Sequence, residues 1–249
     1  YGDIYGFKMT HVVRDEADLA NYAYYVDKVP SQPVYGPAAY AQLTVEQQKN
    51  AQKLAPGDAV WYDVNGDGII DTHDQVKLGN SIPKWMGGFN TSASWKGLTL
   101  FARFDYALGY KKWNSGYQYF MGITSGSFNV PELAKKTWTE DNPTAGLPVL
   151  MTNDTNFKKN YTRNTSLFWE NAAYLCAREI SLSYDLPSQW TKKAMMEKVT
   201  VTLTGQNLFY VTSNNLYTPE YDSKNNTKDD GKGGYALPKT VLMGIKVVF

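Results

Sequence analysis

Residues 85–108, WMGGFNTSASWKGLTLFARFDYAL, hold the pattern that decides the fold class of this chain. Along Leu98–Leu108, successive side chains alternate between two faces, which is typical of a β-strand. One face is apolar and consists of Leu98, Leu100, Ala102, Phe104, Tyr106 and Leu108. The pair Lys96-Gly97 precedes this strand and predicts a tight hairpin turn that joins it to a strand over Met86–Trp95.

The same alternation recurs along the rest of the chain and predicts an all-β fold. We expect about six antiparallel strands, each bounded by turn or loop residues. The segments are Tyr5–Val13, Met86–Trp95, Leu98–Leu108, Glu179–Asp185, Lys198–Tyr210 and Val241–Phe249.

The connections between these strands differ strongly in length. Those at Lys96-Gly97 and Pro187–Glu197 are short, whereas Arg14–Trp85, Tyr110–Asn171 and Thr212–Thr240 are long. In an up-and-down meander, successive connections lie at alternate ends of the strands, so every long connection falls at the same end. Short periplasmic turns and long extracellular loops are typical of outer-membrane β-barrels. A soluble antiparallel sandwich with decorated loops is the alternative, because alternation alone fits both folds.

Composition excludes several classes of protein. The formal net charge of +1 gives no strong field for nucleic acid. Cys176 is the only cysteine, so an intrachain disulfide framework is excluded and a small buried side chain is expected. The chain contains no apolar run of about 18 residues and therefore no transmembrane helix, but barrel strands need only about 9–11 alternating residues each. It opens without a secretory signal, and we expect a piece of a longer polypeptide.

The long connections contain local structure of their own. Leu43–Leu54 is predicted to be a short helix, because Thr44 and Gln47 match a capping box. Pro131–Trp138 is predicted to be another, with proline near its first turn. The polar segment Ser223–Gly234 is expected to be a mobile loop tip.

The most specific local motif is DVNGDGIIDTHD at residues 63–74, which has the pattern of a calcium loop. Glycine at its sixth position permits the sharp turn, and hard cations such as Ca²⁺ or Mg²⁺ prefer oxygen ligands. Asp replaces the usual Glu at the last position, and no long helices flank the loop. A structural cation that holds the long connection is expected, the alternative being a turn satisfied by its own backbone. The candidate ligands are Asp63, Asn65, Asp67, Asp71 and Asp74 through side chains and Ile69 through its carbonyl.

Other groups of residues carry less information. Trp113, Tyr117 and Tyr119, followed by Phe120, form an aromatic cluster that fits loop packing or a partner surface better than direct substrate contact. Arg103 and Asp105 project from the mixed face and are expected to form an ion pair, with cargo contact as the second possibility. The common hydrolase, zinc and phosphate-loop motifs are missing, so no catalytic residue is assigned.

Several short motifs together resemble one protein family. These motifs are Pro56-Gly57-Asp58, YDVNGDGIID at 62–71, Asp74, Leu78-Gly79-Asn80, Pro83, Tyr174–Tyr184 with Leu186-Pro187, GQNLF at 205–209, Pro219-Glu220, Tyr235, Pro238 and the final Val247-Val248-Phe249. Together they resemble the C-terminal region of SusC-like TonB-dependent transporters, over nearly the whole length of the chain except residues 14–55.

The resemblance implies about the last six strands of a 22-stranded outer-membrane barrel, a multi-pass wall in contact with lipid and with the remainder of its own barrel. It also implies import of glycans or peptides, a SusD-like surface lipoprotein as partner, and TonB acting through an N-terminal part with a plug domain that this chain lacks. Phe249 resembles the assembly signal at the end of such barrels.

Two other classes of function stay open on the sequence alone. One is a soluble, calcium-stabilised carbohydrate-binding β module, for which the aromatic cluster would stack sugars. The other is a fragment of a secreted glycosidase, with Glu132 and Glu140 as candidate carboxylates. The transporter wall is our main hypothesis, and in it the chain is not an enzyme.

Overall fold

The computed structural model describes residues 2–122, 132–150, 158–214, 218–220, 228–229 and 237–249. The chain divides into two compact units. We call Tyr1–Gly79, Trp113–Glu170 and Lys228–Lys232 the loop unit. We call Asn80–Lys112, Asn171–Thr227 and Gly233–Phe249 the sheet unit. Each unit is considered below by itself.

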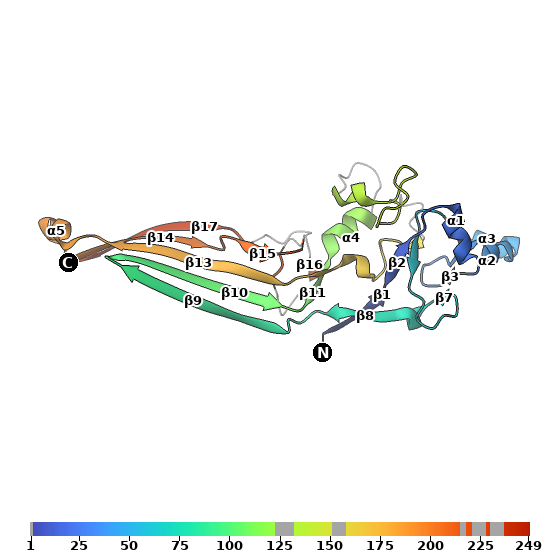
Figure 1. Cartoon of the computed structure of the whole chain (residues 1–249), viewed down its shortest axis with the longest axis horizontal. Coiled ribbons are helices and arrows are strands. Elements are labelled where there is room, and N and C mark those ends of the chain that lie inside the picture. The colour runs from blue at the N-terminus through green and yellow to red at the C-terminus, as the bar shows by residue number, and fades with distance from the viewer. Residues whose placement is uncertain (1, 123–131, 151–157, 215–217, 221–227, 230–236) are drawn as a thin grey trace. The chain divides into compact units, whose positions relative to one another are not determined.

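The sheet unit is built from long antiparallel strands in the order β17-β14-β13-β10-β9, and β15 also pairs with β13 (Figure 1). None of the helices among the described residues of the whole chain is long and apolar enough to span a membrane. The elements of the sheet unit are β9 (Trp85–Trp95), β10 (Leu98–Leu108), β13 (Tyr174–Asp185), α5 (Ser188–Thr191), the 3-10 helix η6 (Lys192–Ala194), β14 (Lys198–Gln206), β15 (Tyr210–Thr212) and β17 (Thr240–Val248).

The predicted hairpin between β9 and β10 is confirmed. Leu98 pairs with Trp95, and the two residues between them have positive φ angles, 48° at Lys96 and 87° at Gly97. This left-handed conformation matches the right-handed twist of the flanking strands. The short connection between β13 and β14 lies at the same end of the sheet, because Tyr184 pairs with both Leu98 and Val201.

The two faces of the sheet differ in chemistry. The registers align one row across all five long strands, and this row is apolar: Ala93, Leu100, Leu182, Leu203 and Met243. Its residues are exposed or nearly half-exposed, and the four large ones range from 42% at Leu182 to 72% at Met243. The neighbouring row carries hydroxyl pairs across strands, including Ser94 with Thr99 at 2.9 Å and Ser183 with Thr202 at 3.0 Å. The sheet therefore presents an apolar face that no described residue covers fully.

The loop unit consists of short elements and small sheets, and its strands β8, β11 and β12 each share one or two end residues with the sheet unit: Asn80, Lys111, Lys112 and Asn171. Its sheets pair β1 with β8, β2 with β6, and four strands in the order β5-β4-β3-β7, and a further sheet has the order β12-β11-β16. The elements are β1 (Asp3–Phe7), β2 (Met9–Val12), α1 (Glu16–Leu19), η1 (Ala20–Tyr22), β3 (Val26–Asp27), β4 (Val34–Tyr35), α2 (Pro37–Ala41), α3 (Val45–Lys49), β5 (Gln52–Lys53), β6 (Ala59–Trp61), β7 (Ile69–Ile70), η2 (Thr72–Asp74), β8 (Gln75–Asn80), β11 (Lys111–Asn114), α4 (Ser115–Gly122), η3 (Glu132–Lys136), η5 (Ser166–Phe168), β12 (Trp169–Asn171) and β16 (Lys228–Asp229).

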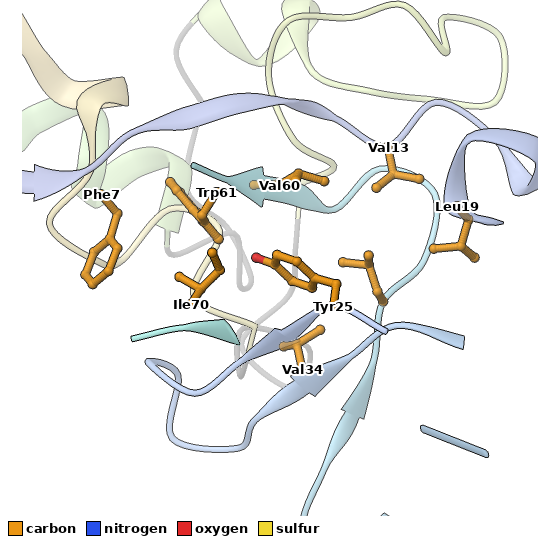
Figure 2. Close-up of a cluster of buried hydrophobic side chains, with 10 residues drawn as sticks. Phe7, Val13, Leu19, Tyr25, Val34, Val60, Trp61 and Ile70 are labelled. Atoms are coloured by element: carbon orange, nitrogen blue, oxygen red, sulfur yellow. The ribbon is translucent and has the colours of Figure 1, made fainter. Parts of the chain in front are cut away.

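A buried apolar cluster organises the first part of the loop unit. Figure 2 shows the ring of Tyr25 among Val34, Val60, Trp61 and Ile70, and each of these five side chains is buried. Burial of this apolar area offsets the entropy of ordering a long connection. The loop unit thus has a core of its own, although its strands are short.

Two buried ion pairs join segments that lie far apart in the sequence of the loop unit. Nη2 of Arg163 lies 2.6 Å from Oδ2 of Asp27, and both side chains are at most 4% exposed. The guanidinium also lies 4.4 Å from the ring centroid of Trp61, a cation–π contact. Similarly, Nζ of Lys158 lies 2.5 Å from Oδ2 of Asp58. These contacts attach residues 158–163 to the cluster around Trp61.

The sequence prediction for Tyr5–Val13 is wrong in its pairing. The segment is extended, but it forms β1 and β2, which pair with β8 and β6 in the loop unit instead of joining the long sheet. Strand propensity is local, whereas the choice of partner depends on residues far away in the chain. The sixth strand of the long sheet is instead β15.

Other predicted elements are confirmed in part. The capping box of Thr44 and Gln47 is present, but the helix that it starts ends at Lys49, and Gln52 and Lys53 form β5. The predicted strand Lys198–Tyr210 breaks after Gln206, because Asn207 has a φ of 51°. The predicted helix over Pro131–Trp138 is the 3-10 helix η3, and Pro131 lies outside the described residues.

The predicted loop tip Ser223–Gly234 lies outside the described residues except at β16. Cys176 is a free, buried cysteine, as expected from the sequence.

Candidate functional site

The calcium-type loop has a compact conformation in which acidic side chains accept backbone N–H groups. Asp63 accepts from Gly66 and Gly68 at 2.8 and 2.7 Å, one on each carboxylate oxygen. Asp67 accepts from the N–H of Ile69 at 2.8 Å and from Nδ2 of Asn65 at 2.9 Å. Gly66 and Gly68 have φ angles of 75° and 77°, which explains why glycine stands at both positions. These hydrogen bonds gather Asp63, Asn65 and Asp67 in one turn.

Asp74 has a different environment from the other acidic residues of the loop. It is fully buried, and its oxygens accept the N–H groups of Val64 at 2.9 Å and of Asp71 at 2.7 Å. Asp71 is partly exposed, and its carboxylate accepts from the backbone N–H of His73 and lies 2.9 Å from the imidazole Nδ1. The backbone hydrogen bond from His73 is the main cause that lowers the pKa of Asp71 below its ordinary value.

In this loop the acidic side chains accept hydrogen bonds from the backbone of the same turn. This is the arrangement that the sequence offered as the alternative to a metal site. Among the residues that the structure describes, no three His, Cys, Asp or Glu side chains are grouped so as to hold a metal ion. A carboxylate that accepts an N–H group still has lone pairs for a cation, so the turn is compatible with both interpretations. The role of Asp63, Asn65, Asp67, Ile69, Asp71 and Asp74 as ligands stays a prediction.

The aromatic cluster packs inside the loop unit. Trp113 lies in β11, is only 6% exposed, and belongs to a core cluster with Met121, Tyr161 and Phe168. Its indole N–H donates to Gln118 at 3.0 Å. Burial of this kind supports the loop-packing role of Trp113.

The other aromatic residues of this segment lie on α4. Tyr117 packs against the same core cluster as Trp113. Tyr119 and Phe120 form an edge-to-face pair with ring centroids 5.5 Å apart, and Phe120 is 39% exposed. Tyr117 and Tyr119 stay candidates for contact with cargo or a partner.

The predicted ion pair between Arg103 and Asp105 is wrong. Nη2 of Arg103 lies 3.4 Å from Glu179, its cross-strand neighbour on β13. Asp105 is bound by Arg178 through two hydrogen bonds, at 2.6 Å from Nε and 2.8 Å from Nη2. The cause is a β-bulge: the register shifts between Arg103 and Phe104, so that Arg178 is the extra residue on β13.

The same arginine fixes a segment of the long connection that leads to β17. Nη2 of Arg178 lies 2.9 Å from Glu220, whose carboxylate also accepts the hydroxyl of Tyr210. Nζ of Lys112 donates to the carbonyls of Thr218 and Glu220 at 3.0 and 3.1 Å. The sheet unit thus holds residues 218–220 in place through charged hydrogen bonds.

Sequence reasoning did not identify Arg178 or Glu220 as interacting residues. A signal for them was present, because Pro219-Glu220 belongs to the motifs that carry the family resemblance. The bulge that brings Arg178 to Asp105 has no local sequence signature, since it depends on the register of two strands.

Known proteins give the context for this arrangement. The chain matches no protein-family model. It is 28% identical over 204 residues to the TonB-dependent receptor P26 of Formosa agariphila, across 78% of this chain and 20% of that protein. It is 25% identical over 215 residues to the TonB-dependent receptor P39 of the same organism, across 82% of this chain and 20% of that protein. The chain is homologous to the TonB-dependent receptors.

Solved structures share the fold of this chain. The RagAB peptide importer in its open-open state matches with a TM-score of 0.65 at 21% identity, over 99% of this chain and 22% of that chain. Its closed-closed state matches with a TM-score of 0.60 at 28% identity, over 77% of this chain and 21% of that chain. The chain spans about a fifth of the length of the receptors and structures that it matches.

Phe249 directly follows β17, and its side chain is 88% exposed. Its role as an assembly signal in a TonB-dependent receptor stays a prediction.

Proposed function

We propose that this chain forms part of the barrel wall and the long loops of a TonB-driven importer in the bacterial outer membrane. In this proposal the long strands of the sheet unit belong to the last part of a barrel of about 22 strands, a number that comes from the family resemblance. The loop unit comprises connections at the extracellular end.

The exposed apolar row across the sheet is the observation that carries this proposal. Leu100, Leu182, Leu203 and Met243 would contact water in a soluble protein, which disfavours contiguous exposed apolar patches. β9 and β17 are the two outermost long strands of the sheet. Among the described residues, each of them pairs with a long strand on one side only. Lipid tails on the apolar face and further barrel strands at the edges would satisfy both features.

A soluble carbohydrate-binding module fits these features less well. Such a module buries the apolar face of its sheet against a second layer. The sheet unit has no second layer among its described residues, and its buried cluster is small: Ala107, Tyr110, Ala172, Tyr174 and Cys176. The family relatives are receptors and transporters, which also disfavours the glycosidase alternative.

Peptides are the cargo that we favour over glycans, with a SusD-like surface lipoprotein as partner. The support is the likeness to a peptide importer, RagAB. The test uses the full-length protein in a strain with and without TonB. We expect detergent-dependent extraction from washed outer membranes, co-purification of a lipoprotein, and TonB-dependent uptake of a labelled oligopeptide. A freely soluble protein would overturn the proposal, and uptake of labelled oligosaccharide instead of peptide would overturn only the choice of cargo.

We also propose that the 63–74 loop binds Ca²⁺ or Mg²⁺ and that the cation stabilises the loop unit. The supporting geometry is the turn in which Asp63, Asn65 and Asp67 lie together. The cation would have a structural role only.

A further inference from the structure

The end of the sheet unit where the short connections lie is formed by two turns, and we call it the turn end. One turn is Trp95–Leu98, between β9 and β10, and the other is Asp185–Lys198, between β13 and β14. In Figure 1, α5 lies at this end, beyond the long strands. Apolar side chains of both turns are exposed: Trp95 by 70%, Trp190 by 63% and Met195 by 89%. A surface with several exposed apolar side chains marks contact with a partner or a membrane.

The connection between β13 and β14 has a defined backbone. The N–H of Trp190 donates to the carbonyl of Pro187 at 2.9 Å, and the N–H of Met195 donates to that of Lys192 at 3.1 Å. Thr191 lies between these two hydrogen bonds, and its side chain is buried. The exposed side chains of α5 and η6 are therefore presented from a folded turn rather than from an irregular loop.

Met195 is the most exposed apolar residue of this connection. Its φ angle is 57°, in the left-handed region where residues other than glycine are uncommon. Water offers its thioether side chain no favourable contact, whereas removal of such a side chain from water is favourable. The interfacial region of a bilayer takes up exposed side chains of this kind without any protein partner.

The apolar face of the sheet changes in chemistry toward the turn end. The row that lies two residues closer to the turns than the row of Leu100 and Met243 consists of Trp95, Leu98, Tyr184, Val201 and Ile245. Trp95 and Tyr184 combine an apolar ring with a polar group, and such residues concentrate where hydrocarbon meets water. Nζ of Lys96, in the adjoining turn, lies 4.8 Å from the ring centroid of Trp95. The face thus passes from aliphatic to aromatic to cationic residues.

The turn end carries an excess of positive charge. Its two turns contain more lysines than carboxylates, namely Lys96, Lys192, Lys193 and Lys198 with Asp185 and Glu197. Nζ of Lys198 lies 2.8 Å from Oδ2 of Asp185, so these two charges neutralise each other. Lys192 and Lys193 are exposed and take part in none of the ion pairs among the described residues. Their ammonium groups are available to an anion.

We propose that the turn end binds the headgroups of anionic phospholipids, with Lys192 and Lys193 contacting the phosphate and Trp190 and Met195 entering the bilayer interface. Charge complementarity favours an anionic over a zwitterionic headgroup. Short turns face the periplasm in outer-membrane barrels, so the lipid belongs to the periplasmic leaflet. The inference rests on the proposed function, because it takes the apolar face to be in lipid. It goes further in naming the headgroup class and the residues that recognise it.

Native mass spectrometry of the full-length protein in detergent tests the headgroup preference. The probes are phosphatidylglycerol and phosphatidylcholine with identical acyl chains, added in equal amounts. We expect the wild type to retain phosphatidylglycerol in preference. Lys192→Gln together with Lys193→Gln is expected to lower the affinity for phosphatidylglycerol about 5-fold for each lysine removed, the scale of one lysine at an anionic surface, and to leave phosphatidylcholine unchanged.

Two further double variants serve as controls. Lys49→Gln with Lys53→Gln removes the same charge from exposed residues of the loop unit, and is expected to keep the preference. Lys192→Arg with Lys193→Arg keeps the charge at the turn end and is expected to keep the preference too. Retention by the arginine variant shows that charge, rather than an altered fold of the turn, decides the binding.

Fluorescence in vesicles locates the bound lipid. The full-length protein is inserted into phosphatidylcholine vesicles that contain either brominated phosphatidylglycerol or brominated phosphatidylcholine at the same mole fraction. The signal of Trp190 is the difference between the wild type and Trp190→Phe. We expect brominated phosphatidylglycerol to quench this signal more strongly, because the lysines beside Trp190 enrich it there. The double glutamine variant should abolish the difference between the two lipids.

The proposal fails if the wild type retains both lipids equally, if the double glutamine variant keeps the preference, or if the control at Lys49 and Lys53 loses it. Equal quenching of Trp190 by both brominated lipids would place the anionic lipid elsewhere on the protein and overturn the assignment to the turn end. None of these results changes detergent extraction or TonB-dependent uptake, which test the proposed importer separately. A freely soluble protein would overturn both.

Discussion

The two units of this chain use apolar and charged residues in opposite ways. In the loop unit, Ile70 and Trp61 are buried and ion pairs lie inside the core, as in a water-soluble domain. In the sheet unit, Met243 and Ile245 are 72% and 65% exposed, and the opposite face carries hydroxyls and charges. This difference agrees with the proposed function, in which water surrounds the loop unit and lipid covers one face of the sheet unit.

The largest effect is expected on removing the cation of a buried pair in the loop unit. Arg163→Met leaves the Asp27 carboxylate buried without its partner, which costs about 3–5 kcal/mol of local stability. We expect rapid hydrogen exchange and proteolysis in the loop unit, while the sheet unit stays protected. The matched control is Asp27→Asn with Arg163→Met, which should recover most of the loss. If hydrogen exchange and proteolysis increased equally in both units of the single variant, the two units would not unfold independently.

A charge on the apolar face provides the most direct test of the difference in solvent. Met243→Arg should lower the free energy of unfolding by about 2–4 kcal/mol if this residue faces the bilayer midplane, because the guanidinium then enters hydrocarbon. Val45→Arg introduces the same group at a residue of the loop unit that is 75% exposed, and should change stability by less than about 0.5 kcal/mol. Reversible folding into phospholipid vesicles measures both. Similar costs for the two variants would remove the distinction between the units.

Removal of divalent cations is expected to affect the connection Arg14–Trp85 and to leave the long strands intact. EDTA should increase protease cleavage within Arg14–Trp85, and excess Ca²⁺ should reverse it, because a bound cation ties the turn at Asp63 and Asp67. Asp63→Asn should abolish the response to EDTA, and Asp141→Asn, at an exposed position, should retain it. Identical cleavage patterns in EDTA and in Ca²⁺ would argue against the metal site.

The smallest effect is a pH dependence that belongs to the same unit. Burial raises the pKa of Asp27 above its ordinary value of 3.8, although the charge of Arg163 opposes the shift. The folded loop unit therefore binds this proton more tightly than the unfolded chain does. Its contribution to stability is present below about pH 4 and is lost as the pH rises through the folded pKa. Asp27→Asn should flatten this part of the profile, measured by hydrogen exchange of the loop unit between about pH 4 and 7. A profile identical to that of the wild type would exclude Asp27 as its source.

Much of the sheet unit could be predicted from the sequence, because its signals are local. The alternation of Leu98–Leu108 depends only on the geometry of an extended chain, and the Lys96-Gly97 turn depends only on two backbone conformations. The capping box at Thr44 is equally local and is also present. The resemblance to TonB-dependent receptors followed from short motifs in the same way.

Tertiary structure decided the features that join distant residues. The pairing of Tyr5–Val13 with β6 and β8, the bulge that directs Arg178 to Asp105, and the burial of Trp113 all depend on contacts across long sequence separations. The row that aligns Trp95 with Tyr184 at the turn end is of this kind too, since it depends on the registers of β10 with β9 and β13. Sequence by itself determined which segments are strands and turns, because propensity and periodicity act over a few residues. The pairing of strands and the contacts between side chains depend on residues that are far apart in the sequence. Only the folded structure of the whole chain therefore determines them.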